Sequence, residues 1–162
     1  MIKQPQIETM TEKKLVGKHV LMSLSDNKTR ELFQGFMPRR REIKSNLGTG
    51  VICMQVYDPA LNFKDFTPDT AHHKWAAVEV ADFVEVPDGM ETFTIPAGMY
   101  AVFLYKGTPA EFGPTFNYIF NTWLPGSAYE ADDRPHFEVL GEKYKNNDPE
   151  SEEEIWVPIR LK

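Results

Sequence analysis

The sequence contains little cysteine, no long apolar run and none of the common catalytic motifs. Its single cysteine, Cys53, excludes an internal disulfide and a structural zinc site, and favours a reducing, cytoplasmic location. No stretch reaches the roughly 18 apolar residues of a membrane-spanning helix, and the first residues lack the apolar segment of a signal peptide. The motifs of serine hydrolases, phosphate-binding loops, dinucleotide-binding folds and zinc proteases are absent, so neither a metal nor a cofactor is predicted.

Aromatic and acidic residues, in contrast, are abundant. The chain has 162 residues, 41% of them hydrophobic, with 11 Phe, 6 Tyr and 3 Trp, which suits one domain with a substantial core. Its net charge is −6, although residues 1–50 carry 10 basic and 5 acidic side chains. The acidic balance argues against nucleic acid as the main partner. The basic excess includes Arg39, Arg40, Arg41 and Lys44, which form either a solvated helix end or a contact surface for a partner.

Two segments have the apolar spacing of helices. The first lies within about 27–44 and the second within about 109–124. The second carries one apolar stripe, made of Phe112, Phe116, Ile119, Phe120 and Trp123. Each segment contains a proline, Pro38 or Pro114, which predicts a kink or a later start of the helix.

The remaining apolar segments have the composition of strands. They are 14–23, with Gly17 as a candidate bulge, 50–57, 74–86, 99–105, 134–140 and 154–161. The order strand, helix, strand, strand thus occurs twice, with a break near residue 87, so the single domain 1–162 divides into halves of about 5–86 and 87–162. We predict an α+β fold in which duplicated β-α-β-β units form one antiparallel-rich sheet. Two helices would cover one face, and the other would form a ligand groove. The acidic segment 146–154 is predicted to be a solvent-exposed connection.

Two glutamates are candidate groove residues. On the strand 134–140, Phe137 and Val139 point to one face and Glu138 to the other. If the apolar pair faces the helices, Glu138 faces the groove, where it would anchor a cation or act as a general acid or base. Glu79 alternates in the same way and is a second candidate acid. The alternative for both glutamates is an exposed position on a strand.

Several aromatic residues are candidate walls of that groove. They are Trp75, Trp123, Tyr57, Tyr100 and Phe112, and core packing is the alternative for each. Cys53 is predicted to be a buried, inert thiol. The neighbours His72 and His73 point in different directions on an extended chain, so a loop role is favoured over a metal site.

The chain resembles a known family in the order and spacing of several short motifs. These are 95–103 (IPAGMYAVF), 105–107 (YKG), 123–125 (WLP), 134–138 (RPHFE) and 155–159 (IWVPI). They look like the GyrI-like domain, also called the bacterial transcription activator effector-binding domain, over the whole chain and most strongly over 88–160.

The resemblance implies a duplicated β-α-β-β fold whose groove binds hydrophobic, often cationic small molecules. It also implies that Glu138 meets the cation of the ligand. Phe112 stands where a tyrosine is expected, so a phenol role there is lost. Residues 1–26 are too short for a helix-turn-helix, so no direct DNA binding is expected.

Three functions are therefore considered. The first is binding of a hydrophobic, cationic small molecule by a stand-alone effector-binding protein. The second is hydrolysis of cyclopropanoid or similar strained electrophiles, with Glu138 as the catalytic group and Trp123 and Tyr57 positioning the substrate. The third is a protein-interaction module, for gyrase or a regulator, that uses the basic segment near Arg39 and Arg41.

Overall fold

One antiparallel sheet organises the molecule. The computed structural model describes residues 4–62, 65–141, 143–145 and 148–162. Within these residues the strands are β1 (Gln6–Met10), β2 (Lys13–Met22), β3 (Asn46–Val56), β4 (His72–Val80), β5 (Glu91–Ile95), β6 (Gly98–Lys106), β7 (Tyr129–Ala131), β8 (His136–Leu140) and β9 (Glu152–Leu161). The helical segments are α1 (Thr29–Phe36), η1 (Met37–Glu42), η3 (Pro109–Glu111), α2 (Phe112–Asn117), η4 (Tyr118–Trp123) and α3 (Leu124–Gly126).

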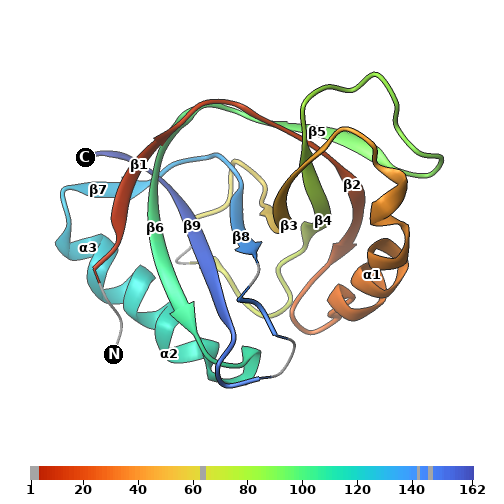
Figure 1. The fold of residues 1–162 in the computed structure, drawn as a ribbon. Coiled ribbons are helices and arrows are strands. Elements are labelled where there is room, and N and C mark those ends of the chain that lie inside the picture. Colours follow the sequence, from red (N-terminus) through yellow and green to blue (C-terminus); the bar gives the residue numbers. More distant parts are fainter. Residues whose placement is uncertain (1–3, 63–64, 142, 146–147) are drawn as a thin grey trace.

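The strand order is symmetrical about the pair β3–β8. The order is β1-β6-β9-β8-β3-β4-β2-β5, and β7 pairs with β9. One half of the sheet contains β3, β4 and β2, which belong to the series β2-α1-β3-β4 in the chain. The other half contains β8, β9 and β6, which belong to the series β6-α2-β8-β9. Each side is completed by a strand from elsewhere in the chain, because β1 pairs with β6 and β5 pairs with β2. The short β1–β2 connection therefore joins the two sides (Figure 1).

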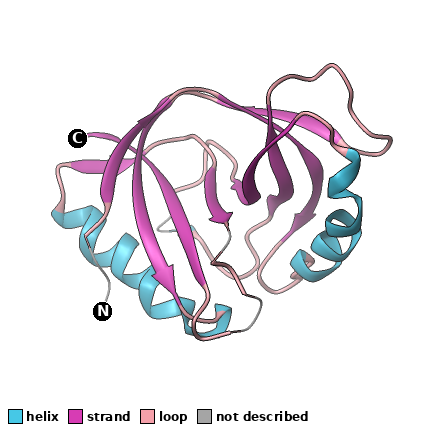
Figure 2. Cartoon of the chain, viewed as in Figure 1, coloured by secondary structure: helices cyan, strands magenta, loops and turns pink. Residues whose placement is uncertain are grey.

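The helical segments form two continuous stretches, α1–η1 and η3–α3, and both pack against one face of this sheet. Leu32 and Phe36 of α1 contact Val51, Ala76 and Val78 of β3 and β4. Ile119 of η4 belongs to a second cluster, with Ala101 and Phe103 of β6 and Ile155 and Val157 of β9. The helices lie at opposite sides of the molecule (Figures 1 and 2), and the central strands β3 and β8 run between them.

The opposite face of the sheet is filled by a third cluster. Its members are Met10, Leu15, Ile52, Met54, Trp75, Ala77, Ile95, Tyr100 and Phe137, which come from seven different strands. The two edges of the sheet meet in this cluster, because Met10 lies on β1 and Ile95 on β5. The sheet therefore curls around an apolar core on this side.

The prolines in the helical segments coincide with changes of winding. The α-helix α1 passes into the 3-10 helix η1, which has Pro38 in its first turn. In the second segment the 3-10 turn η3 precedes α2, which contains Pro114, and α2 continues into the π-helical turn η4. A proline lacks an amide donor, so it is tolerated where the hydrogen-bond pattern is already altered.

Arg134 fixes the start of β8 against two other strands. Its guanidinium donates to the carbonyl oxygens of Met99 (2.6 Å) and Ile159 (3.0 Å), and it lies over the Tyr100 ring. A Cβ atom at Gly98 would lie 2.4 Å from the Arg134 Cζ atom, so only glycine leaves room for this arrangement. β8 is thereby held at a defined position between β3 and β9.

The structure confirms the α+β class and the single antiparallel sheet with its helices on one face, and it changes two details. Gly17 is not a bulge, because the register of β2 with β4 is continuous through the pair Gly17–Ala77. A Cβ atom at Gly17 would lie 2.1 Å from the Ala76 carbonyl oxygen, so the close approach of the two strands requires glycine there. The face away from the helices is occupied by core rather than by a groove. No helix among the described residues is long and apolar enough to cross a membrane.

Candidate functional site

The main cavity lies on the helix-bearing face, between the two sides of the sheet. Its volume is about 590 Å³, which is within the roughly 300–1,000 Å³ of small-molecule sites. β3, β4, β8 and β9 form its floor, α2 and η4 form one wall, and the segment that precedes α1 reaches its rim. The position differs from the sequence prediction, which placed the groove on the face away from the helices.

Strand alternation explains why Glu138 lies in this cavity. Phe137 belongs to the core on the opposite face, and Val139 packs against that core. Glu138 therefore points to the helix-bearing face, where it is paired in register with Cys53 and Ile155. The sequence argument placed Glu138 in the groove on the condition that the apolar pair faces the helices. The condition is not met, because Phe137 and Val139 pack on the face away from the helices, and Glu138 faces the cavity because the cavity lies on the helix-bearing face.

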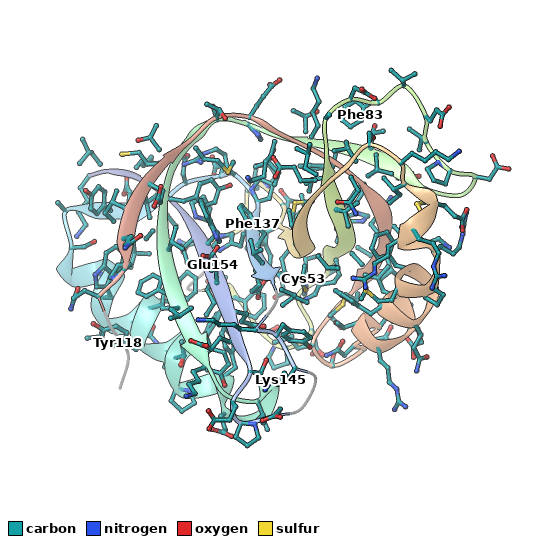
Figure 3. All side chains as sticks on the ribbon, in the orientation of Figure 1. Cys53, Phe83, Tyr118, Phe137, Lys145 and Glu154 are labelled. Carbon is teal, nitrogen blue, oxygen red and sulfur yellow. The ribbon has the colours of Figure 1, made fainter. Side chains whose placement is uncertain are left out.

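The floor of the cavity is polar. Gln55 donates a hydrogen bond to the Glu138 carboxylate at 3.1 Å, and its amide lies 3.7 Å from the Cys53 sulfur. Lys74 of β4 and Glu153 of β9 line the same cavity. Cys53 and Phe137 mark this central part of the sheet in Figure 3, where β3 and β8 are adjacent.

Aromatic rings form the walls. Phe116 lies 4.6 Å from Phe120 between ring centroids, and Phe112 lies 6.2 Å from Phe116. On the other wall, the Tyr57 ring contacts the His136 and Phe66 rings in edge-on geometry, at 5.3 and 6.0 Å. Rings on both sides of a carboxylate provide apolar and cation–π contacts for a flat or cationic molecule.

Burial sets the charges in the cavity. It raises the pKa of Glu138, although the Lys74 charge and the Gln55 hydrogen bond act in the opposite direction. It lowers the pKa of His136 to about 4, so this imidazole is neutral at pH 7. It raises the pKa of Cys53 to about 12, which makes the thiol a poor nucleophile. Burial opposes the charge of Lys74, but Cys53 and the two glutamates outweigh this effect and raise its pKa.

Three residues predicted for the site line this cavity. They are Glu138, Tyr57 and Phe112. Burial and the Glu138 charge raise the pKa of Tyr57, so its phenol is un-ionised at neutral pH. The edge of the Phe112 ring contacts Tyr105, at 5.3 Å between centroids.

Four other predicted residues lie outside it. Trp75, Glu79 and Tyr100 point to the opposite face of the sheet, where Trp75 stacks on His19, Glu79 lies 3.5 Å from Lys13, and the Tyr100 hydroxyl donates to the Pro135 carbonyl. Trp123 packs on Phe103 and Tyr129 beneath η4. For the three aromatic residues the packing alternative applies, whereas Glu79 is a partly buried strand residue that lies beside Lys13.

Sequence reasoning missed several cavity residues. Lys74 was seen only as the start of a strand, and Glu153 only as one acid in the segment 146–154. Residues 146 and 147 of that segment lie outside the described residues, whereas Glu153 belongs to β9. The period-2 pattern of β9 contains a usable signal, because Glu153 shares a face with the buried Ile155 and Val157. Phe116 and Phe120 were placed in the helical stripe without a role in the site.

The His72–His73 pair begins β4 and does not lie in a loop, and the basic segment lies outside the cavity. His72 lines the cavity, whereas His73 points to the opposite face and lies 3.3 Å from His19 between Nδ1 atoms. No group of three or more His, Cys, Asp or Glu side chains in the described ranges could hold a metal ion. In the basic segment, Arg39 binds the Glu42 carboxylate at 2.8 Å, while Arg40 and Arg41 are exposed.

Comparison with known proteins agrees with the fold. The transcriptional regulator BrlR of Pseudomonas aeruginosa is 28% identical over 148 residues, which are 90% of this chain and 51% of BrlR, so the chain spans about half the length of that relative. SAV2435 bound to tetraphenylphosphonium superposes with a TM-score of 0.70 at 16% identity, covering 98% of this chain and 94% of SAV2435. The EcmrR C-terminal domain superposes with a TM-score of 0.68 at 17% identity, covering 100% of both chains. Residues 3–160 match the GyrI-like small molecule binding domain. The protein is thus a member of the GyrI-like small molecule binding domain family.

Proposed function

We propose that the protein binds hydrophobic, positively charged small molecules in the cavity between its two helices. One observation carries this proposal. The Glu138 carboxylate lies at the base of a cavity of about 590 Å³ whose walls are aromatic. A buried carboxylate costs free energy, which an incoming cation recovers by pairing with it. The structural relative SAV2435, which was solved with tetraphenylphosphonium, supports this class of ligand.

Titration of the protein with tetraphenylphosphonium tests the proposal. We expect binding by calorimetry at neutral pH, and we expect Glu138→Gln to reduce the affinity about tenfold or more, because an amide keeps the shape but loses the charge. Glu154→Gln is the matched control, since Glu154 lies on the same sheet but is exposed. Equal affinities of wild type and Glu138→Gln would show that Glu138 is not the anchor.

A neutral probe separates charge from shape. Triphenylphosphine oxide presents similar rings without a net charge. Its affinity is expected to be the same in wild type and Glu138→Gln, within about twofold. A parallel loss for the neutral probe would indicate that the substitution damages the cavity rather than removing an ionic contact.

A second candidate function is hydrolysis of a strained electrophile in the same cavity. The raised pKa of Glu138 favours it, because a carboxyl group that titrates closer to neutral pH is a better general acid or base. Tyr57 is positioned to contact a substrate, whereas Trp123 is outside the cavity. An enzyme would convert a cyclopropane-containing electrophile, and Glu138→Gln would abolish turnover while the substrate still binds. Binding without turnover favours the first proposal.

A further inference from the structure

The floor of the cavity holds three charged side chains from three strands. Glu138 comes from β8, Glu153 from β9 and Lys74 from β4. Lys74 makes no ion pair within 4.0 Å of a described carboxylate, but its charge acts on both glutamates. With all three groups ionised the floor carries one net negative charge. With one glutamate protonated it carries none.

The two glutamates are not equivalent. Glu138 accepts a hydrogen bond from Gln55 and is affected by the Lys74 charge, and both effects favour its ionised form. Glu153 has no hydrogen-bond donor among the described residues. Burial raises the pKa of Glu153 to about 7, the Glu138 charge adds to this, and Lys74 opposes it. When no ligand is bound, the proton therefore belongs on Glu153, because fewer interactions stabilise the ionised form of its carboxyl group.

The other titratable groups that face Glu153 do not change charge near neutral pH. They are Cys53 on β3, Tyr105 on β6 and Tyr144 after β8, and the pKa of each is raised, mainly by burial. Burial lowers the pKa of both cavity histidines, His72 and His136, which favours their uncharged forms at neutral pH. Lys145 also lines the cavity, at its exposed end (Figure 3). α2 contributes Phe112, Phe116 and Asn117, which carry no charge.

We propose that the cavity takes up an organic cation in exchange for the proton on Glu153. The inference rests on the proposed function and adds its coupling to pH. In the exchange the O–H bond of Glu153 breaks, the proton passes to solvent, and the cation replaces its charge, so the filled floor is neutral overall. Lys74 makes the exchange necessary, because it offsets Glu138 and leaves a neutral floor until Glu153 ionises. Glu153 is thus a residue that determines specificity for cations.

The exchange predicts how affinity depends on pH. Below the pH at which Glu153 ionises, cation affinity should fall by up to about tenfold per pH unit, because ligand binding must remove a proton. Above it, the affinity should level off. Tetraphenylphosphonium is a suitable probe because its charge is permanent, so any pH dependence belongs to the protein.

Calorimetry between about pH 5.5 and about pH 8.5 tests this coupling. For the wild type we expect tetraphenylphosphonium affinity to rise at least about tenfold across this range. Repeating the titration near pH 6 in buffers of different ionisation enthalpy should reveal the release of about one proton per ligand bound. Glu153→Gln should bind at every pH as weakly as the wild type does at the acidic end of the range, and it should release no proton. Glu154→Gln, altered next to it on the opposite face, should behave as wild type.

Each outcome decides between the proposals. Wild-type affinity that is constant with pH, or a pH dependence that survives in Glu153→Gln, would overturn the proton exchange and leave the proposed function intact. Absence of tetraphenylphosphonium binding at every pH would overturn both. If Glu153→Gln fails to fold, carbon NMR of the Glu153 carboxyl in the wild type gives the same test. Its titration should move to lower pH when the cation is bound, and an unmoved titration would contradict the exchange.

Discussion

His136 and Glu138 lie two positions apart on β8 and face the same cavity, yet burial moves their pKa values in opposite directions. The pKa of the imidazole falls to about 4, and that of the carboxyl group rises. Both shifts have one cause, since an environment of low polarity disfavours whichever form is charged. At neutral pH, His136 therefore serves the cavity as an uncharged aromatic surface beside Tyr57 and Phe120.

The buried His136 should make stability depend on pH. Its pKa is depressed from 6.5 to about 4 in the folded state, so between these values the unfolded chain binds more protons. Stability should therefore fall as the pH drops from about 6.5 to about 4, by up to about 3 kcal/mol. Chemical denaturation at several pH values measures this. His136→Gln should reduce the loss, and His73→Gln, which alters an exposed histidine, should not. Equal losses in all three proteins would contradict the assignment to His136.

The cavity residues show how far single positions can be predicted from the sequence. Glu138, Tyr57 and Phe112 were found because their residue types suit ligand contact and they lie on recognisable elements. Lys74 and Glu153 were missed because their importance depends on which strands share a sheet region, and β4 is far in sequence from β8 and β9. Glu79 and Trp75 were misplaced because strand alternation gives two faces without saying which one carries the cavity.

The segment from α2 to η4 presents two rows of apolar side chains. Ile119 and Trp123 pack against the sheet, whereas Phe112, Phe116 and Phe120 line the cavity, which Ile119 also reaches. The π-helical turn η4 begins at Tyr118, between the last two phenylalanines. One helix thus completes the core and also forms the aromatic wall.

The exposed part of this wall should contribute to binding without contributing much to stability. Phe116 is 37% exposed, so Phe116→Ala should leave the free energy of unfolding within about 0.5 kcal/mol of wild type. The affinity of the Phe116→Ala variant for tetraphenylphosphonium should be about fivefold to tenfold lower than that of wild type, because an aromatic contact is lost. Calorimetry with parallel thermal unfolding gives both quantities. Tyr118→Ala is the control, because Tyr118 does not line the cavity. Unchanged affinity in Phe116→Ala would exclude this wall from the binding surface.

At the level of elements, the strands with a clear apolar pattern could be predicted, and three short strands without one could not. The segments 14–23, 99–105 and 134–140 agree closely with β2, β6 and β8. β1, β5 and β7 were missed because they are 3 to 5 residues long and contain at most one buried residue each, so they carry no clear apolar pattern. The face of the groove was mispredicted because β8 is covered on both sides, and a buried strand of this kind gives no indication of where the helices lie.

The two sides of the molecule exchange their outer strands. β1 lies at the start of the chain and pairs with β6, while β5 follows the predicted boundary near residue 87 and pairs with β2. Division of the chain at this boundary into two halves remains a prediction. The strand exchange implies that such halves, if they are repeats of one unit, are not independent folding units.

Cutting the chain at that boundary should therefore yield two incomplete pieces. Residues 1–86 lack β5, which leaves β2 paired only with β4. Residues 87–162 lack β1, which leaves β6 paired only with β9. Each fragment also loses its partner in the central pair β3–β8. We expect neither fragment to give a dispersed NMR spectrum alone, and we expect a mixture of the two to regain the spectrum of the intact chain. A well-dispersed spectrum from 1–86 alone would show that this half folds independently.

The same exchange of strands has a kinetic consequence. Pairing of residues 6–10 with 98–102 cannot begin until most of the chain is present, and the loop closed by that contact spans more than half of the sequence. Chains dominated by such distant pairings pass through an entropically costly transition state and fold in milliseconds to seconds rather than microseconds. A ribosome would therefore release most of this protein before either edge of its sheet is complete.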